Sequence, residues 1–240
     1  TMESAVAGTS TLNVADAISI GVRHFGQQWI PWATSMGVVL LIPITFIIPI
    51  IPVFDALAVQ DFFDVPTRVG MIFDQVLPWL ILLLVCACAV VVLVFWLNSM
   101  RNAYRQCRGE TITFGSFFTL RGLLIPFFTL LSVFLIVQVG LMMCTIPGLI
   151  AMVLLMYVPF AAVEPGNTIA EAFIRGWQAF VDNLGKSIGL WLLVAVVYFV
   201  AYLTYFGLLL VCPVVQLIMM VAYLMCARRP IALGVIPAGT

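Results

Sequence analysis

Long runs of apolar residues dominate this chain of 240 residues. A helix that crosses a membrane needs about 20 mostly apolar residues, and six segments of the chain are close to that length. Only 8% of the residues are charged, whereas an average soluble domain has about 25%. We therefore predict an all-α integral membrane protein with six transmembrane helices, at residues 32–54, 77–97, 123–143, 146–163, 187–205 and 208–226.

The positions of lysine and arginine predict how these helices are oriented. With six spans, every basic residue except Arg68 lies on the same side of the membrane. Basic residues in short loops mark the cytoplasmic side, so we expect both termini to be cytoplasmic. The formal net charge is zero, which leaves no bulk field that would attract a nucleic-acid partner.

Two segments that precede predicted spans resemble each other. Residues 13–25 (NVADAISIGVRHF) and 168–180 (TIAEAFIRGWQAF) align without a gap, and glycine occurs at the same place in both, as Gly21 and Gly176. Thr168 and Glu171 have the spacing of a capping box. Apolar residues recur every three or four positions, which predicts amphipathic helices in the plane of the lipid headgroups. The alternative is that these helices are connectors that pack on the protein itself.

A weaker third copy begins at Thr111 with TITFGSFF. The chain is then a single membrane domain of three units, each an amphipathic helix on the cytoplasmic interface followed by a transmembrane hairpin. The predicted units cover residues 11–97, 111–163 and 167–227, and residues 228–240 form a short cytoplasmic tail.

Residues that carry chemistry are scarce in this sequence. None of the six predicted spans contains Asp, Glu, His, Lys or Arg. An ionisable residue inside a membrane usually marks a functional site, so its absence argues against a proton-coupled carrier, a voltage sensor or an intramembrane metalloprotease. His24 is the only histidine and cannot build a usual metal site alone. We interpret it as a headgroup contact, and we expect no cofactor.

Arginines follow the second and the sixth predicted spans. Arg101, Arg105 and Arg108 share one face if the second helix continues into the cytoplasm. They are candidates for binding an anionic lipid or an acidic partner surface. The alternative is that they only set the orientation of the chain in the membrane. Arg228 and Arg229 after the last span have the same two interpretations.

A few other polar residues lie in or beside the spans. Glu164 ends the fourth span and is expected to pair with Arg175 or Lys186 or, more simply, to mark the water boundary. Gln138 and Gln216 lie within spans, and we expect them to form hydrogen bonds between helices rather than a substrate site.

The first predicted span contains Pro43, Pro49 and Pro52. Each proline removes a backbone hydrogen bond and tends to kink the helix. A broken helix can line a cavity, as in transporters, or it can simply bend against its neighbours.

Residues 138–193 resemble a known family. The marks are the IPG hairpin at residues 146–148, the apolar helix that ends in Glu164, then Gly166, an amphipathic helix with the late Trp177, and Asn183. They resemble the YciC-type bacterial inner-membrane proteins and the membrane domain attached to some glycerophosphodiester phosphodiesterases. The resemblance implies six helices and a bacterial inner membrane but little about function. The sequence contains no phosphodiesterase catalytic domain, so that activity does not carry over.

Three kinds of function compete. The first is a non-enzymatic inner-membrane protein that acts as a subunit, scaffold or assembly factor of a larger complex in envelope or lipid homeostasis. Its expected partners are membrane lipids and another membrane protein or a homo-oligomer. The alternative is a lipid-handling or small-solute transport protein with a cavity beside the kinked first span. An enzyme is disfavoured, because the sequence offers no constellation of acid, base or metal ligands.

Overall fold

A computed structural model describes residues 12–41, 68–204 and 207–232, and within these ranges the regular elements are helices, as predicted. In chain order they are α1 (Val14–Gln27), a helix at Trp29–Leu41, α3 (Arg68–Cys107), the 3-10 helix η1 (Phe114–Phe118), α4 (Leu124–Met143), α5 (Thr145–Leu154), α6 (Val158–Ala162), α7 (Ile169–Val181), α8 (Leu184–Thr204) and α9 (Gly207–Cys226).

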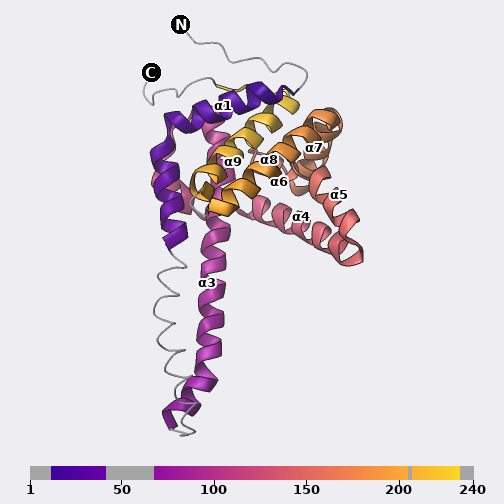
Figure 1. Ribbon diagram of the computed structural model, residues 1–240. Coiled ribbons are helices and arrows are strands. Elements are labelled where there is room, and N and C mark those ends of the chain that lie inside the picture. The colour runs from indigo at the N-terminus through magenta and orange to yellow at the C-terminus, as the bar shows by residue number, and fades with distance from the viewer. Residues whose placement is uncertain (1–11, 42–67, 205–206, 233–240) are drawn as a thin grey trace.

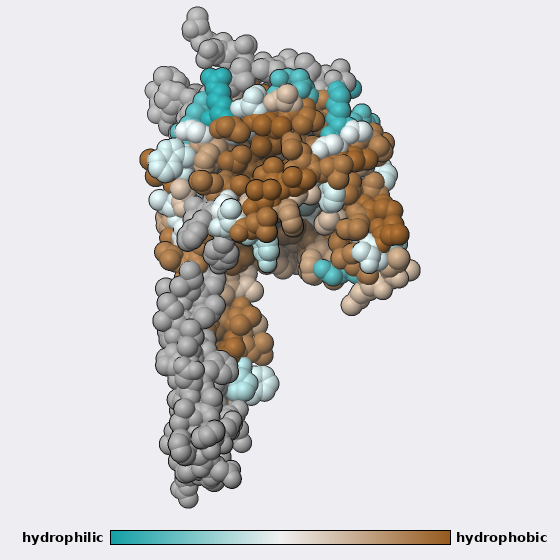
Figure 2. Space-filling view, in the orientation of Figure 1, coloured by the Kyte–Doolittle hydropathy of each residue, from teal (hydrophilic) through white to brown (hydrophobic). Residues whose placement is uncertain are grey.

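Three of the described helices are long and apolar enough to cross a membrane. They are Pro78–Cys107 within α3, Leu124–Met143 and Leu184–Thr204. Hydrophilic residues gather at the end of the molecule where α1 lies, above a broad apolar surface (Figure 2). These features are those of a membrane protein, whereas the six spans and their pairing into three hairpins stay a prediction.

The fourth predicted span is not one continuous helix. Its first part, α5, has 10 residues and is therefore about 15 Å long, half the thickness of a hydrocarbon core of about 30 Å. The chain leaves the helix at residues 155–157 and resumes as α6. Pro159, in the first turn of α6, has no N–H to donate to the carbonyl of Leu155, which explains the break.

The third predicted amphipathic helix, which would begin at Thr111, is not an α-helix in the structure. The segment after Thr111 forms only η1, which has 5 residues and no side-chain cap at Thr113. Phe117 is fully buried, and its ring centroid lies 5.6 Å from that of Phe95 on α3 and 5.0 Å from that of Trp32. Docking of this aromatic ring holds the segment against α3, and the prediction of a third interfacial α-helix is wrong.

The second half of α9 forms the core. Every residue from 215 to 226 is buried. This helix is contacted by α1, α3, α6, α7 and α8. The N-terminal part of α3 and the hairpin of α4 and α5 extend away from it (Figure 1). α1 belongs to the first predicted unit and α9 to the third, so their contact packs these two units directly against each other.

The two aligned glycines each lie where helices cross closely. A methyl group at Gly21 on α1 would lie 2.9 Å from the Cα atom of Ile218 on α9. A methyl group at Gly176 on α7 would lie 2.7 Å from the Cα atom of Val158 on α6. Such distances are too short for a side chain, so both crossings require glycine. The helices also begin as predicted, and the Thr168 capping box is present.

Replacing Gly21 with alanine is expected to destabilise the protein by about 1–3 kcal/mol, because the new methyl group must push α1 away from α9. Gly26→Ala is the matched control on the same helix. Among the described residues, no atom outside the neighbouring backbone of α1 lies within 4 Å of the added methyl group, and alanine favours the helix by up to about 1 kcal/mol. Thermal unfolding in detergent measures both variants, and equal stabilities would contradict the crossing.

Candidate functional site

A buried carboxylate, Glu164, lies in the turn between α6 and α7. Glu164, Pro165, Gly166 and Asn167 form a four-residue turn. Its third residue, Gly166, has φ of 86°, a positive value that glycine adopts without steric cost. The N–H of Asn167 donates to the Glu164 carbonyl at 3.4 Å. This turn brings the Asn167 amide back, so that its Nδ2 donates to the Ala161 carbonyl at 2.8 Å and to Oε2 of Glu164 at 3.3 Å.

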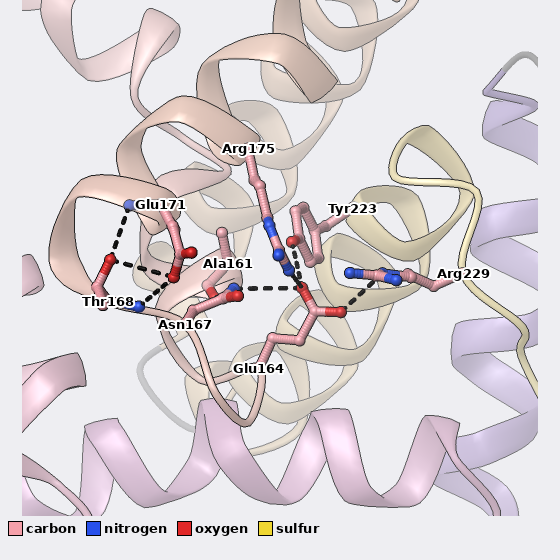
Figure 3. A network of polar contacts seen from close by, with 8 residues as sticks. All are labelled: Ala161, Glu164, Asn167, Thr168, Glu171, Arg175, Tyr223 and Arg229. Carbon is pink, nitrogen blue, oxygen red and sulfur yellow. Dashed lines mark hydrogen bonds and ion pairs between the residues drawn. The ribbon is translucent and has the colours of Figure 1, made fainter.

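Three more donors converge on the same carboxylate from other helices (Figure 3). Nη1 of Arg175 on α7 lies 3.1 Å from Oε2, and Nε of Arg229 lies 2.7 Å from Oε1. The Tyr223 hydroxyl on α9 donates to Oε2 at 3.1 Å. Glu164 is only 7% exposed, and these charge-assisted hydrogen bonds offset the cost of removing its charge from water.

The end of α9 brings Arg229 to Glu164. The N–H of Arg229 donates to the Leu224 carbonyl at 2.8 Å, and the N–H of Arg228 donates to the Met225 carbonyl at 3.1 Å. This is a Schellman motif. Arg228 occupies its left-handed position with φ of 54°, a conformation that costs a residue with a side chain about 1 kcal/mol.

The first part of the predicted cytoplasmic tail packs against the end of α3. Nη1 of Arg108 donates to the Pro230 carbonyl at 3.2 Å, and the N–H of Ala232 donates to the Cys107 carbonyl at 2.9 Å. Ile231 is 2% exposed. Residues 228–232 therefore join α9 to α3 instead of extending into solvent.

The chemistry of Glu164 is that of an anchor. Three of the four donors contact Oε2 and one, Arg229, contacts Oε1, so the carboxylate is held by contacts from its own turn, from α7 and from the end of α9. The predicted pairing with Arg175 is confirmed, Arg229 is an additional partner, and the interpretation of Glu164 as a simple water boundary is wrong.

The arginines predicted to contact lipid are mostly bound within the protein. Arg101 donates to the Arg121 carbonyl at 2.6 Å, and Nε of Arg105 lies 2.7 Å from Oε2 of Glu110. Arg108 and Arg229 make the contacts given above, and Arg228 is exposed. α3 continues to Cys107, as the shared face requires. Binding of anionic lipid by these arginines stays a prediction.

A second buried polar group lies around Gln106 on α3. Its Oε1 accepts a hydrogen bond from Nε1 of Trp32 at 2.9 Å, and its Nε2 donates to the His24 carbonyl. At the corner after α1, the Gln28 side chain accepts from the N–H of Ile112 at 2.7 Å. The same side chain donates to the Glu110 carbonyl at 3.1 Å. These two glutamines fix the N-terminal corner to the end of α3.

His24 is 1% exposed, so the prediction of a headgroup contact is wrong. It shares a face of α1 with Ala17 and Gly21, which are buried against other helices. Burial of His24 lowers its pKa. The backbone of Ala232 raises the pKa, and the positive charge of Arg23 lowers it. Neither ring nitrogen has a regular hydrogen-bond partner among the described residues, which is the environment of a neutral imidazole.

Sequence analysis missed a buried polar stripe on α3. Asn98, Asn102 and Gln106 follow one another at intervals of four and are at most 1% exposed. Nδ2 of Asn98 donates to the Thr119 carbonyl at 2.8 Å. Polar residues at helical spacing directly after an apolar run are the signal that would have found them. The side-chain amide of Gln216 has no partner among the described residues, so its expected interhelical hydrogen bond is not formed there.

The predicted cavity-lining prolines, Pro43, Pro49 and Pro52, lie outside the described residues. Within the described ranges, no three side chains of His, Cys, Asp or Glu are grouped to hold a metal ion. Comparison with protein-family models, with curated proteins and with solved structures finds no match. The resemblance to the YciC type therefore stays a prediction.

Replacing Glu164 with glutamine is expected to destabilise the protein by about 1–3 kcal/mol, because two arginines lose their counter-charge and the buried hydrogen bonds weaken. Glu110→Gln makes the same chemical change in the Arg105 pair, whose side chains are 39% and 51% exposed, and should cost less than about 0.5 kcal/mol. Denaturant unfolding in detergent measures both, and equal losses would remove the anchor role from Glu164.

The burial of His24 predicts a pH dependence. Its pKa is lowered from the usual 6.5, so the unfolded chain binds the proton more readily than the folded one. The stability from this residue is present above pH 6.5 and decreases as the pH falls below that value. His24→Leu removes the titration. The difference in unfolding free energy between the two proteins should therefore shift against the wild type from roughly pH 7 to pH 5, and parallel profiles would show that His24 titrates normally.

Proposed function

We propose that this chain is a non-enzymatic, multi-pass protein of the bacterial inner membrane, with six transmembrane helices in three hairpins and both termini in the cytoplasm. It serves as a subunit, scaffold or assembly factor of a larger membrane complex in envelope or lipid homeostasis. Its partners are membrane lipids and another membrane protein or a second copy of the chain.

The exposed surface of α3 carries this proposal. α3 extends beyond the other described helices (Figure 1), and along this extension it exposes large apolar side chains, with Trp79 71% and Leu83 70% exposed. Contiguous apolar surface of this kind needs lipid or another apolar helix as its neighbour. Among the described residues, no other helix lies beside this part of α3 (Figure 1), which leaves it open to a partner.

The polar contacts of Glu164 and Gln106, at the end of the molecule away from the extension of α3, support the role of a scaffold. The Glu164 anchor joins the turn after α6 to α7 and to the end of α9. The Gln106 contacts join α1 and the following helix to α3. Buried networks of this kind make a structure rigid when their groups are satisfied. A rigid arrangement of these helices suits a protein that presents a constant surface to partners.

The alternative, a lipid-handling protein, is favoured by a different observation. Two apolar grooves lie on the described helices. One, of about 370 Å³, lies between α5 and α8, and the other, of about 380 Å³, lies between α8 and α9.

Native mass spectrometry after gentle extraction from the cell membrane tests the two functions. A protein partner in fixed ratio, or a defined homo-oligomer, is expected. A photoreactive amino acid at Leu83 should then give an adduct of the partner's mass, whereas the same probe at Val200, which is 55% exposed on α8, should not. A lone chain that retains a defined lipid and gives no adduct at Leu83 would replace the scaffold with lipid handling.

A further inference from the structure

Among the described residues, only aliphatic side chains line the groove between α8 and α9. Leu190, Val194 and Val197 come from α8, Val211 and Val214 from α9, and Ile18 from α1. Its volume is about 380 Å³. Such a surface has no polar atom that would bind a polar ligand, and on a membrane-embedded helix pair it faces hydrocarbon.

The groove, together with Lys186 one turn before it, extends along about one leaflet of a bilayer. Leu190, Leu193 and Val197 repeat at helical spacing on one face of α8, and Lys186 lies on the same face one turn before Leu190. The 11 steps from residue 186 to residue 197 rise about 16 Å at 1.5 Å per residue. This is about half of a hydrocarbon core of 30 Å, so the face runs from the water boundary to the middle of the membrane.

The cross-section of the groove selects its occupant. The α8 side chains that line the groove, from Leu190 to Val197, span about 10.5 Å, so a volume of 380 Å³ corresponds to a cross-section of about 36 Å². An α-helix with side chains is about 10 Å across and needs about 80 Å². The groove is therefore too narrow for a helix of a partner protein and has room for a single hydrocarbon chain.

The cytoplasmic end of this face carries a cation. Lys186 is exposed in the first turn of α8, and within the described residues it forms no ion pair. The exposed Asp182 lies one turn earlier, at the end of α7. A lysine ammonium on its flexible stem is a point charge that pairs with phosphate. The surface thus combines an aliphatic groove with a positive end at the interface.

The amphipathic helix α1 covers this end of the groove. Its small residues Ala17 and Gly21 are buried, with Gly21 directly against α9, and Ile18 beside them reaches the groove. Asp16 and Ser19 are exposed. The boundary between apolar and polar surface on α1 therefore lies at the same end of the groove as Lys186.

We propose that the α8–α9 groove binds one acyl chain of an anionic phospholipid of the cytoplasmic leaflet, and that Lys186 pairs with the headgroup phosphate. This site rests on the membrane-embedded part of the proposed function. It is independent of whether the chain belongs to a larger complex, because the occupant is lipid.

Two tryptophan variants of adjacent residues test the groove. Val197→Trp places a large ring inside it, whereas Val196→Trp places the same ring on the outer face of α8, where Val196 is 60% exposed. The purified proteins are reconstituted in nanodiscs of equal parts phosphatidylglycerol and phosphatidylcholine, and retained lipid is counted by native mass spectrometry. Phosphatidylglycerol with a photoreactive group on its acyl chain maps the contact by peptide sequencing.

The wild type and Val196→Trp should retain one phosphatidylglycerol and crosslink to peptides of α8, α9 and α1. Val197→Trp should lose both signals at an unchanged melting temperature. A Val197→Trp protein that melts lower is replaced by Val194→Phe, a smaller change in the same groove. Retention and crosslinking that persist in every groove variant would overturn the site.

The headgroup is tested with Lys186→Gln and Lys186→Arg. One basic residue at a membrane surface corresponds to about a fivefold preference for anionic lipid. Lys186→Gln should lower the preference for phosphatidylglycerol over phosphatidylcholine by about that factor while the acyl-chain crosslinks persist, and Lys186→Arg should keep the preference. Equal preference in the wild type and Lys186→Gln would remove the phosphate contact from the proposal. Loss of a protein partner in native extracts leaves these results unaffected, so the two proposals fail separately.

Discussion

The burial of one negative charge organises the junction of α6, α7 and α9 in this protein. A carboxylate at 7% exposure is stable only where donors replace its water, and Glu164 obtains them from Asn167 in its own turn, from Arg175 on α7, and from Tyr223 and Arg229 at the end of α9. The donors come from three parts of the chain. The relative positions of α6, α7 and α9 therefore depend on this charge, and so does the left-handed turn at Arg228.

Close packing complements the charge. Lipid tails are as apolar as leucine, so the hydrophobic effect contributes little to the association of helices within a membrane, and close approach has to supply the attraction. Gly21 lets α1 lie on α9, and Gly176 lets α7 lie on α6. Both amphipathic helices use a strip of small residues for this contact, which leaves an adjacent apolar strip free. On α7 that strip includes Ile174, Trp177 and Val181, which are 56%, 46% and 44% exposed.

Local signals explain what was predictable from the sequence. The positions of α4, α8 and α9, the caps of α1 and α7 and the extension of α3 follow from apolar length, capping chemistry and helical spacing. The break at Pro159, the docking of Phe117 and the burial of His24 depend on which helix lies alongside, and a single sequence does not contain that information. Arg229 shows the limit most clearly. Its position after a predicted span suggests either a contact with lipid or a partner or a role in orienting the chain, yet it is the nearest partner of Glu164 in the turn between α6 and α7.

The separation of Glu164 and Arg229 along the chain has a consequence for biosynthesis. The two residues are 65 positions apart (229 minus 164), and a ribosome needs roughly 3–13 s to make that length. During this interval Glu164 has Arg175 but not Arg229 or Tyr223, so its charge remains hydrated and the turn after α6 stays at the membrane surface. The contacts around Glu164 can form in full only after α9 and Arg229 have left the ribosome. Assembly of this junction therefore follows the synthesis of α9.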